Sequence, residues 1–267
     1  MIQINQRRSS IPILNDYIDR FWQYSYDGNL QAERPFIPEG IFEIIFELGD
    51  QVKFKTCQSD EWVERPRNFL GGLFDSHYQL ELKGKLEFFG IRFKYGKFRH
   101  FVETPLNHFR NQKVSIVDVF GSDANEIIEQ VNLLSSIVER EKLLSHFLFS
   151  KLSVHHKTNS IFENLASRES ATYASCLSEA CILKISERHL RRVFNSEMGM
   201  APKQFFRLRR LNALLKSSDA NVNLTSRAFE LGYYDQAHFI NDIKKLTGRP
   251  PSVLFNSINI AQRKFLV

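Results

Sequence analysis

A basic, amphipathic segment from Ile185 to Leu215 constrains the fold of this chain more than any other stretch of its sequence. Ser186 is suited to cap a helix N-terminus, and apolar residues follow it at helical spacing: Leu190, Val193 and Phe194. Gly199 is suited to end that helix, and Pro202 is suited to the first turn of the next one. The spacing therefore predicts two consecutive helices, each burying one apolar face.

The other side of this segment is strongly basic. Between Cys181 and Lys216 the chain has nine Lys and Arg against two Glu, an excess of seven that exceeds the net charge of +6 of all 267 residues. The basic residues are Lys184, Arg188, Arg191, Arg192, Lys203, Arg207, Arg209, Arg210 and Lys216. A short helix that buries one face and presents arginine on the other suits the major groove of DNA.

A second segment repeats this pattern further along the chain. Small Ala180 and Ala228 each stand in a first helix, where they allow close packing of a second helix. The polar caps of the second helices are Ser186 and Asp235, and their apolar anchors are Leu190 with Phe194 and Phe239 with Ile243. Each unit ends at a glycine followed by proline, which are Gly199 with Pro202 and Gly248 with Pro250 and Pro251. The repeat predicts two helix-turn-helix units.

Three motifs, SERHLRRVF, MGMAPKQFFRLRRL and ELGYYDQAHFINDIKKLTGRPP, resemble the AraC/XylS family of bacterial transcription regulators. The resemblance covers about the last 100 residues. It implies an all-α DNA-binding domain in which a long helix, Pro202 to Lys216, bridges two helix-turn-helix units. The two recognition helices of that family enter successive major-groove faces of one site. Double-stranded DNA is thus the expected partner, and RNA polymerase is a further partner consistent with the family.

The resemblance places candidate DNA contacts on the exposed positions of both recognition helices. In the first unit they are Arg188, His189, Arg191 and Arg192, and in the second Gln236, Ala237, His238 and Asn241. Arginine can fork onto guanine, Gln and Asn suit adenine, and Ala suits a thymine methyl group. Candidate phosphate contacts, which add affinity without sequence information, are Lys203, Arg207, Lys244 and Lys245. The alternative is a solvated charged face, with both histidines in packing or phosphate-contacting roles.

Two residues depart from the family pattern. Glu179 and Arg227 each precede the small alanine of a unit, at a position that is usually apolar in the family. Because a buried, unpaired charge would cost several kcal/mol, each side chain is expected to reach solvent or a partner. The sequence does not say which.

The N-terminal part of the chain predicts a different architecture. Leu14 to Tyr24 has the spacing of a short amphipathic helix, and the strand-like segments are Ile41 to Leu48, Val52 to Thr56, and a hairpin with its tip at Lys83 to Lys85. Asn125 to Leu152 predicts two helices. The expected fold is therefore α+β with two domains. Residues 1–152 form a small cupin-like β-barrel or sandwich with a helical tail, and residues 153–267 form the DNA-binding domain, beyond a polar linker.

The role of the N-terminal part stays open at this point. FIPEGIFEIIFELGD and FFGIRFKYGKFRHF resemble a poorly characterised β-rich domain often found ahead of this DNA-binding module. Family members usually use that half for effector sensing or dimerisation, which leaves a small-molecule effector and a homodimer as alternatives. Four aromatic residues could line a pocket, although core packing is expected for most of them: Phe42, Phe46, Phe54 and Trp62.

The sequence shows no pattern of a catalytic, metal or cofactor site. His77 stands alone, and the three cysteines (Cys57, Cys176 and Cys181) lack zinc-site spacing and indicate a reduced, cytoplasmic protein. The chain has no signal-peptide pattern and no apolar run long enough to cross a membrane. We expect a regulator and not an enzyme. The alternatives are a cupin-like small-molecule-binding protein or enzyme with an accessory helical domain, and an adaptor that has lost DNA binding.

Overall fold

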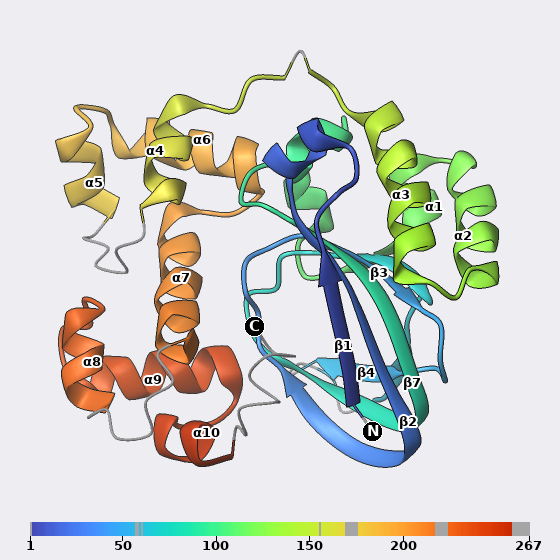
Figure 1. Ribbon diagram of the computed structural model, residues 1–267. Coiled ribbons are helices and arrows are strands. Elements are labelled where there is room, and N and C mark those ends of the chain that lie inside the picture. The colour runs from blue at the N-terminus through green and yellow to red at the C-terminus, as the bar shows by residue number, and fades with distance from the viewer. Residues whose placement is uncertain are drawn as a thin grey trace.

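The computed structural model describes residues 2–56, 59, 61–154, 156–168, 176–216 and 224–257. It has a β-rich N-terminal region followed by a helical C-terminal region, as the α+β expectation requires (Figure 1). The strands are β1 (Ile2–Arg7), β2 (Ile18–Phe36), β3 (Glu43–Glu47), β4 (Lys53–Thr56), β5 (Val63–Glu64), β6 (Asn68–Gly71), β7 (Tyr78–Phe93) and β8 (Lys113–Ser115). Three short 3₁₀ helices accompany them: η1 (Pro12–Asp16), η2 (Phe98–Phe101) and η3 (Leu106–Phe109).

All of these strands belong to one antiparallel sheet. The order is β1-β2-β7-β3-β6-β8, while β4 pairs with β7 and β5 pairs with β4. The long strands β2 and β7 are paired from Ile18 opposite Phe93 to Phe36 opposite Tyr78. Because β7 also pairs with β3 and β4, this single strand holds the sheet together.

The prediction of a helix from Leu14 to Tyr24 is wrong. Only the 3₁₀ turn η1 is helical, and strand β2 begins at Ile18. A register shift between Ile18 and Arg20 brings both Ile18 and Phe21 into the core. This bulge gives the strand buried residues three positions apart, a spacing that imitates a helix.

The prediction of a hairpin tip at Lys83 to Lys85 is also wrong, because strand β7 continues through these residues without a turn. Gly84 does have a left-handed φ of 72°, and it lies opposite Leu30 next to a register shift in β2. The Lys85 backbone N–H donates to Asp50 Oδ2 at 2.7 Å. Glycine therefore serves a bulge here instead of a turn. The strand expected from Val52 to Thr56 is present as β4, but its partners are β5 and β7.

The helical predictions after the β-rich region are confirmed for the described residues. Asn125 to Leu152 contains α2 (Asp123–Leu133) and α3 (Ile137–Lys151), which follow the short α1 (Ile116–Phe120). The C-terminal helices are α4 (Ser160–Ser167), α5 (Cys176–Ile182), α6 (Glu187–Met198), α7 (Pro202–Lys216), α8 (Leu224–Glu230), α9 (Gln236–Thr247) and α10 (Pro251–Ser257). The break expected at Ser217 to Asn223 lies outside the described residues. In Figure 1, α6 lies near one end of α7 and α9 lies near the other.

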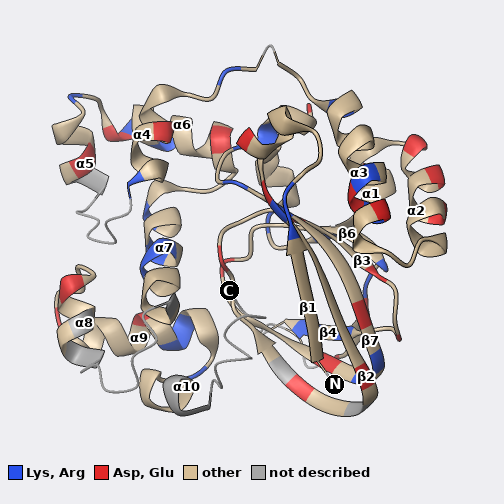
Figure 2. Ribbon diagram, viewed as in Figure 1, with Lys and Arg blue, Asp and Glu red and all other residues tan. Residues whose placement is uncertain are grey.

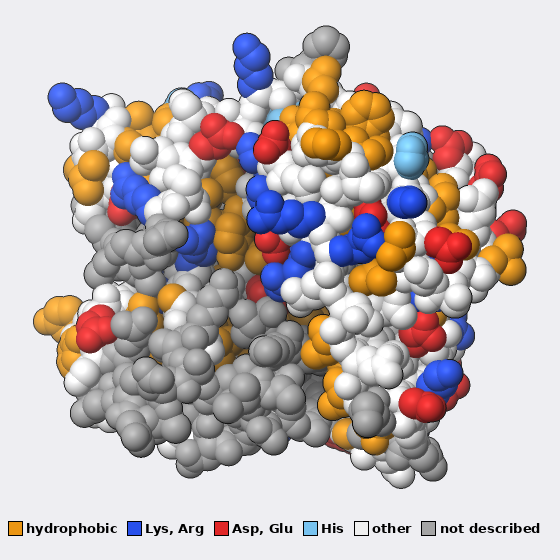
Figure 3. Space-filling view, in the orientation of Figure 1, with side chains coloured by type: hydrophobic (Ala, Val, Ile, Leu, Met, Phe, Trp, Pro, Cys, Tyr) orange, Lys and Arg blue, Asp and Glu red, His pale blue; other side chains and the backbone are white. Residues whose placement is uncertain are grey.

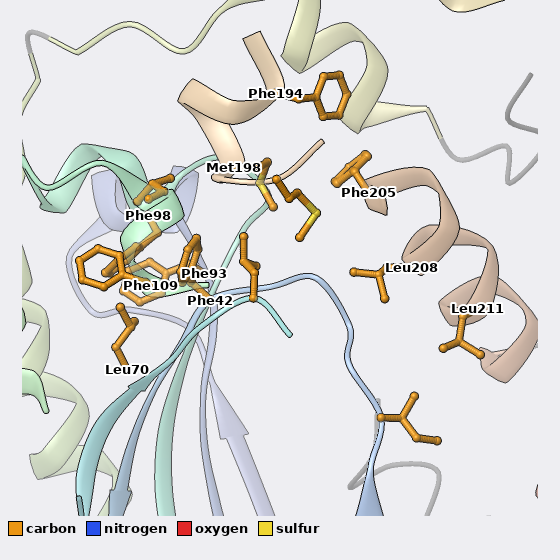
Figure 4. Close-up of a cluster of buried hydrophobic side chains, with 14 of the residues drawn as sticks. Phe42, Leu70, Phe93, Phe98, Phe109, Phe194, Met198, Phe205, Leu208 and Leu211 are labelled. Atoms are coloured by element: carbon orange, nitrogen blue, oxygen red, sulfur yellow. The ribbon is translucent and has the colours of Figure 1, made fainter. Parts of the chain in front are cut away.

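One hydrophobic core joins the β-rich region to the first of these helices (Figure 4). Met198, at the end of α6, accepts a hydrogen bond on its sulfur from the Gly96 backbone N–H at 2.9 Å. The Phe205 ring of α7 meets the Tyr95 ring edge-on, with centroids 5.2 Å apart. The residues on either side of position 153 therefore pack as one body, and the boundary between 152 and 153 stays a prediction.

Phe205→Ala should test this joint core. Phe205 is 0% exposed and packs against the rings of Phe162 and Phe194 as well as Tyr95. Removing a fully buried ring of this kind costs about 3–5 kcal/mol of unfolding free energy. Urea unfolding of the full chain, followed by circular dichroism, measures the loss. The matched control is Phe149→Ala on α3, whose side chain is half exposed and whose removal should cost under about 1 kcal/mol. Equal losses of unfolding free energy in the two variants would contradict the assignment of Phe205 to a core shared by the β-rich region and the C-terminal helices.

Candidate nucleic-acid interface

The first helix-turn-helix unit is built from α5 and α6, as its motif predicts. The Ser186 side chain accepts from the His189 backbone N–H at 3.2 Å and so caps α6. Gly199 ends the helix with a left-handed φ of 70°. The three apolar residues predicted to face the core are buried: Leu190, Val193 and Phe194. Cap, anchor and stop thus all have the roles that the sequence predicts.

The opposite face of α6 is open to solvent. Arg188, Arg191 and Arg192 are exposed, and His189 is half-buried. Arg191 pairs with Glu187 at 3.0 Å, and Arg192 Nη2 lies 3.0 Å from His189 Nδ1. Among the described residues Arg188 has no such partner. The structure therefore brings the three arginines together on one accessible face, with Arg188 the least engaged.

The second unit, formed by α8 and α9, has the same design. Asp235 caps α9 by accepting from the His238 backbone N–H at 2.6 Å, and Gly248 ends the helix with a φ of 75°. Its buried anchors are Phe239 and Ile243. The candidate contacts Gln236, Ala237, His238 and Asn241 are all exposed. This face carries amides and a methyl group where the first carries arginines.

Helix α7 connects the two units. Its 15 residues span about 22 Å at 1.5 Å per residue. Arg207 of α7 donates to Asp242 of α9 through Nε, and through Nη2 to the Asp242 carbonyl at 3.2 Å. The Tyr233 hydroxyl donates to the same carboxylate at 3.1 Å. Arg207, a candidate phosphate contact, is thus largely buried and fixes α9 on the bridge.

The remaining candidate phosphate contacts are accessible. Lys203, Lys244 and Lys245 are all exposed. Figure 2 shows Lys and Arg along α7, whereas α2, on the far side of the β-rich region, carries several Asp and Glu. In the space-filling view, basic side chains of the C-terminal helices project into solvent at the left (Figure 3). Lys and Arg side chains of α6, α7 and α9 are therefore exposed at the surface.

Glu179 has the partner that its position requires. Glu179 is 3% exposed, and its Oε2 accepts a hydrogen bond of 2.8 Å from Nη1 of Arg168. Arg168 is the residue that follows α4. Arg168 also donates to Asn164 at 2.9 Å. The charge at a normally apolar position is thus neutralised from outside the helix-turn-helix unit. The Arg227 side chain lies outside the described part of the chain.

Contacts from the β-rich region reach both units, and these were not found from the sequence. A Cβ on Gly199 would lie 2.5 Å from the Leu106 carbonyl carbon, so the end of α6 rests directly on η3. Gln204 of α7 is hydrogen-bonded to Asp75 and, at 3.2 Å, to Arg110. The His77 ring lies against the end of α9, where a Cβ on Gly248 would be 2.4 Å from its Nε2, and burial lowers the pKa of the ring.

These contacts lie far apart in the sequence, and none of them involves the candidate base-contacting residues of α6 or α9. The β-rich region therefore holds the helix-turn-helix units at the ends of α6 and α9 and along α7, and its described residues leave Arg188, Arg192, Gln236 and Asn241 exposed. No motif links these positions, so pattern reasoning had no means to find them.

Within the described residues, no group of His, Cys, Asp and Glu is arranged to hold a metal ion. A membrane-crossing helix would need more length and a more apolar surface than any helix in that part of the chain has.

Two protein families match separate parts of this chain. Residues 180–257 match a family described as Helix-turn-helix domain, and residues 6–115 match a Domain of unknown function (DUF6597). The C-terminal segment is a helix-turn-helix domain of the AraC type, which confirms the family resemblance of its motifs. The chain thus carries the DNA-binding module of the AraC-type transcription regulators behind a β-rich domain of another family.

Among curated proteins, the chain is similar to the invasion protein InvF of Salmonella typhi and of Salmonella typhimurium. The identity to each is 34% over 80 residues, which is 30% of this chain and 37% of InvF. The chain therefore spans little more than a third of the length of these relatives.

Two solved structures are similar at low sequence identity. ToxT from Vibrio cholerae has a TM-score of 0.49 and 13% identity, over 90% of this chain and 98% of ToxT. The AraC-like transcriptional activator CuxR has a TM-score of 0.25 and 10% identity, over 79% of this chain and 85% of CuxR.

Breaking the Glu179 pair from its two sides should give unequal losses. Arg168→Ala leaves a carboxylate buried without its cation, which costs about 3–5 kcal/mol of unfolding free energy. Glu179→Leu removes the buried charge and restores the apolar residue usual in the family, so its cost should stay within about 1 kcal/mol. Urea unfolding of both full-length variants measures the difference. A larger loss in Glu179→Leu would contradict the structural role given to Arg168.

Proposed function

We propose that this protein is a sequence-specific, DNA-binding transcription regulator whose two recognition helices read successive major-groove faces of one site. The observation that carries the proposal is the pair of capped helices α6 and α9, in an AraC-type domain, with free polar faces and buried anchors. Helix α7 sets their spacing. Its length of about 22 Å, together with the width of a helix at each end, suits faces separated by one turn of DNA, about 34 Å.

The two units divide the recognition by chemistry. On α6, Arg188 and Arg192 lie one helical turn apart and can enter one groove, where each can bind guanine or phosphate. On α9, Gln236 and Asn241 offer amides suited to adenine, and Ala237 offers a methyl group. Lys203, Lys244 and Lys245, which are exposed, supply phosphate contacts in this proposal. Arg207 acts on DNA through its hold on α9.

We further propose that the β-rich region modulates DNA binding and has no catalytic role. Its contacts fall on the end of α6, on α7 and on the end of α9. A change in this region can therefore alter the relative placement of the two recognition helices without covering either one. A small cupin-like barrel is the arrangement we propose for its strands, with the division between the domains near residue 153. The proposed setting is the cytoplasm, and a second copy of the chain and RNA polymerase are further partners.

Selection of bound sequences from a random DNA pool with the full chain tests the function. A regulator of this kind should yield one site with two conserved patches about 10 base pairs apart. Recovery of no preferred sequence, together with a weak association with DNA that does not change as salt rises, would instead favour a protein-interaction adaptor that has lost DNA binding.

Arg192→Ala and Gln236→Ala should affect DNA binding in different ways. Arg192→Ala should lose about 1–3 kcal/mol of specific binding and relax the preference at its base position. If Arg192 also touches phosphate, the dependence of affinity on salt should become shallower by about one contact. Gln236→Ala should leave the salt dependence unchanged and relax the preference about 10 base pairs away, because α7 fixes that spacing.

The measurement is binding of both single variants and the double variant to a series of base-substituted sites at several salt concentrations. The two losses should nearly add, because the recognition helices are far apart. Loss of preference at the same base positions in both variants would contradict the two-unit reading. So would a Lys244→Ala variant that removes all specificity while Gln236→Ala changes nothing.

A further inference from the structure

Helices α6 and α9 correspond to each other position by position. Each has 12 residues, begins directly after its capping residue and ends at a glycine with a left-handed φ. The candidate Arg192 of α6 therefore corresponds to the candidate Asn241 of α9. By the same count, the candidate Arg191 corresponds to Ile240, which is not among the DNA contacts expected from the sequence. The repeat thus directs attention to an apolar residue where the first unit has an arginine.

Ile240 reaches the outer surface of α9. It is 36% exposed, although it is a large apolar residue. Gln236 lies about one helical turn before it, Lys244 lies about one turn after it, and Asn241 is the next residue, and all three are exposed. The preceding residue, Phe239, is 2% exposed and anchors the helix. Ile240 is thus left partly uncovered, next to two residues proposed to read bases.

The neighbours of Ile240 on α9 are suited to A·T base pairs. An exposed apolar side chain is common on protein surfaces, so exposure alone gives Ile240 no role. Gln236 and Asn241 carry amides, which suit adenine, and the stretch between them contains no Lys, Arg, Asp or Glu. The partner of adenine is thymine, whose 5-methyl group is the apolar feature of the major-groove edges. An aliphatic side chain beside the two amides therefore matches that methyl group.

The shape of Ile240 also suits contact with a methyl group in a fixed position. The branch at its Cβ leaves one strongly preferred χ1 rotamer in a helix. A long unbranched side chain such as Arg191, which holds the same position on α6, has more rotamer freedom to lose on binding. Ile240 has a longer side chain than Ala237, three residues earlier. These two apolar side chains can thus reach methyl groups at different depths in the groove.

From its position and chemistry, we propose that Ile240 is a specificity-determining residue that packs on the 5-methyl group of a thymine. This thymine belongs to the half-site of α9, the base pairs that α9 contacts, which is rich in A·T pairs. Gln236 and Asn241 bind adenines of the same half-site, whereas the arginines of α6 favour guanine in the other. The inference rests on the function proposed above and adds the base composition that α9 reads.

Replacement of thymine by uracil tests the methyl contact. Uracil pairs with adenine as thymine does but lacks the 5-methyl group. Each thymine of the DNA site selected by the full chain is replaced by uracil in turn, and the affinity of the full chain is measured by fluorescence anisotropy. At one thymine or more, the unchanged chain should bind about three- to fivefold more weakly, which is the loss expected for one buried methyl group. Binding that uracil weakens at no position would overturn the proposal.

Ile240→Ala identifies the thymine that Ile240 contacts. The variant should bind the thymine-containing site about three- to tenfold more weakly. At one position in the half-site where Gln236→Ala relaxes the base preference, uracil should weaken the binding of Ile240→Ala no further. The two losses fail to add because the side chain and the methyl group touch each other. Uracil losses that are the same in Ile240→Ala and in the unchanged chain at every position would overturn the proposal.

Two further variants guard against a loss of folding. Ile240→Ala should keep its melting temperature, because the side chain is exposed and alanine is the better helix former. Ile240→Val, which shortens the side chain by one methylene, should lose less affinity in the same direction and serves if Ile240→Ala melts early. The matched control is Val138→Ala on α3, an apolar branched residue that is 39% exposed. It should leave the affinity and every uracil loss unchanged, and a loss equal to that of Ile240→Ala would overturn the proposal.

The same measurements separate this inference from the function on which it rests. If the full chain selects no DNA sequence, the proposed regulator function fails, and the role of Ile240 fails with it. If the chain selects a site with two conserved patches but no thymine is coupled to Ile240, the function stands and the role of Ile240 alone is overturned.

Discussion

The packing of α6 against the β-rich region is the contact on which the rest of the structure depends. It is made at Gly199, where the left-handed backbone that ends α6 lies on Leu106 and Asn107 with no room for a side chain. Glycine is needed there twice, once for the conformation and once for the close approach. The same few residues place Met198 under Gly96 and begin the turn into α7. A helix stop that belongs to the DNA-binding motif is thereby also the joint between the two regions.

This packing also limits how far the recognition helices can move. Both are held from behind, α6 by the aromatic core and α9 by Arg207 and Tyr233 on Asp242. Long side chains such as Arg188 and Lys244 keep their freedom on the outer side. A helix that is held rigidly loses less entropy when it docks on a partner, while its long exposed side chains can still adapt to the surface that they meet.

The sequence predicted the helical half well and the β-rich half only in outline. Caps, anchors and stops are local, so Ser186, Asp235 and Gly199 could be assigned from spacing alone. The bulges at Ile18 and Gly84 depend on pairing between β2 and β7, and the residues paired at these bulges lie more than 50 positions apart, so the pattern of a single strand cannot contain that information. The contacts of Gln204 and Asn212 with the β-rich region could not be predicted for the same reason.

The contact between Asn212 and position 39 has a consequence for how such proteins diverge. Asn212 of α7 donates to the main-chain oxygen of Glu39, an atom that every amino acid possesses, while the side chain of Glu39 points to Arg92. The hydrogen bond to Asn212 therefore does not depend on which side chain stands at position 39. The attachment of the segment around position 39 to α7 is thus independent of the ion pair that the segment makes on its other side.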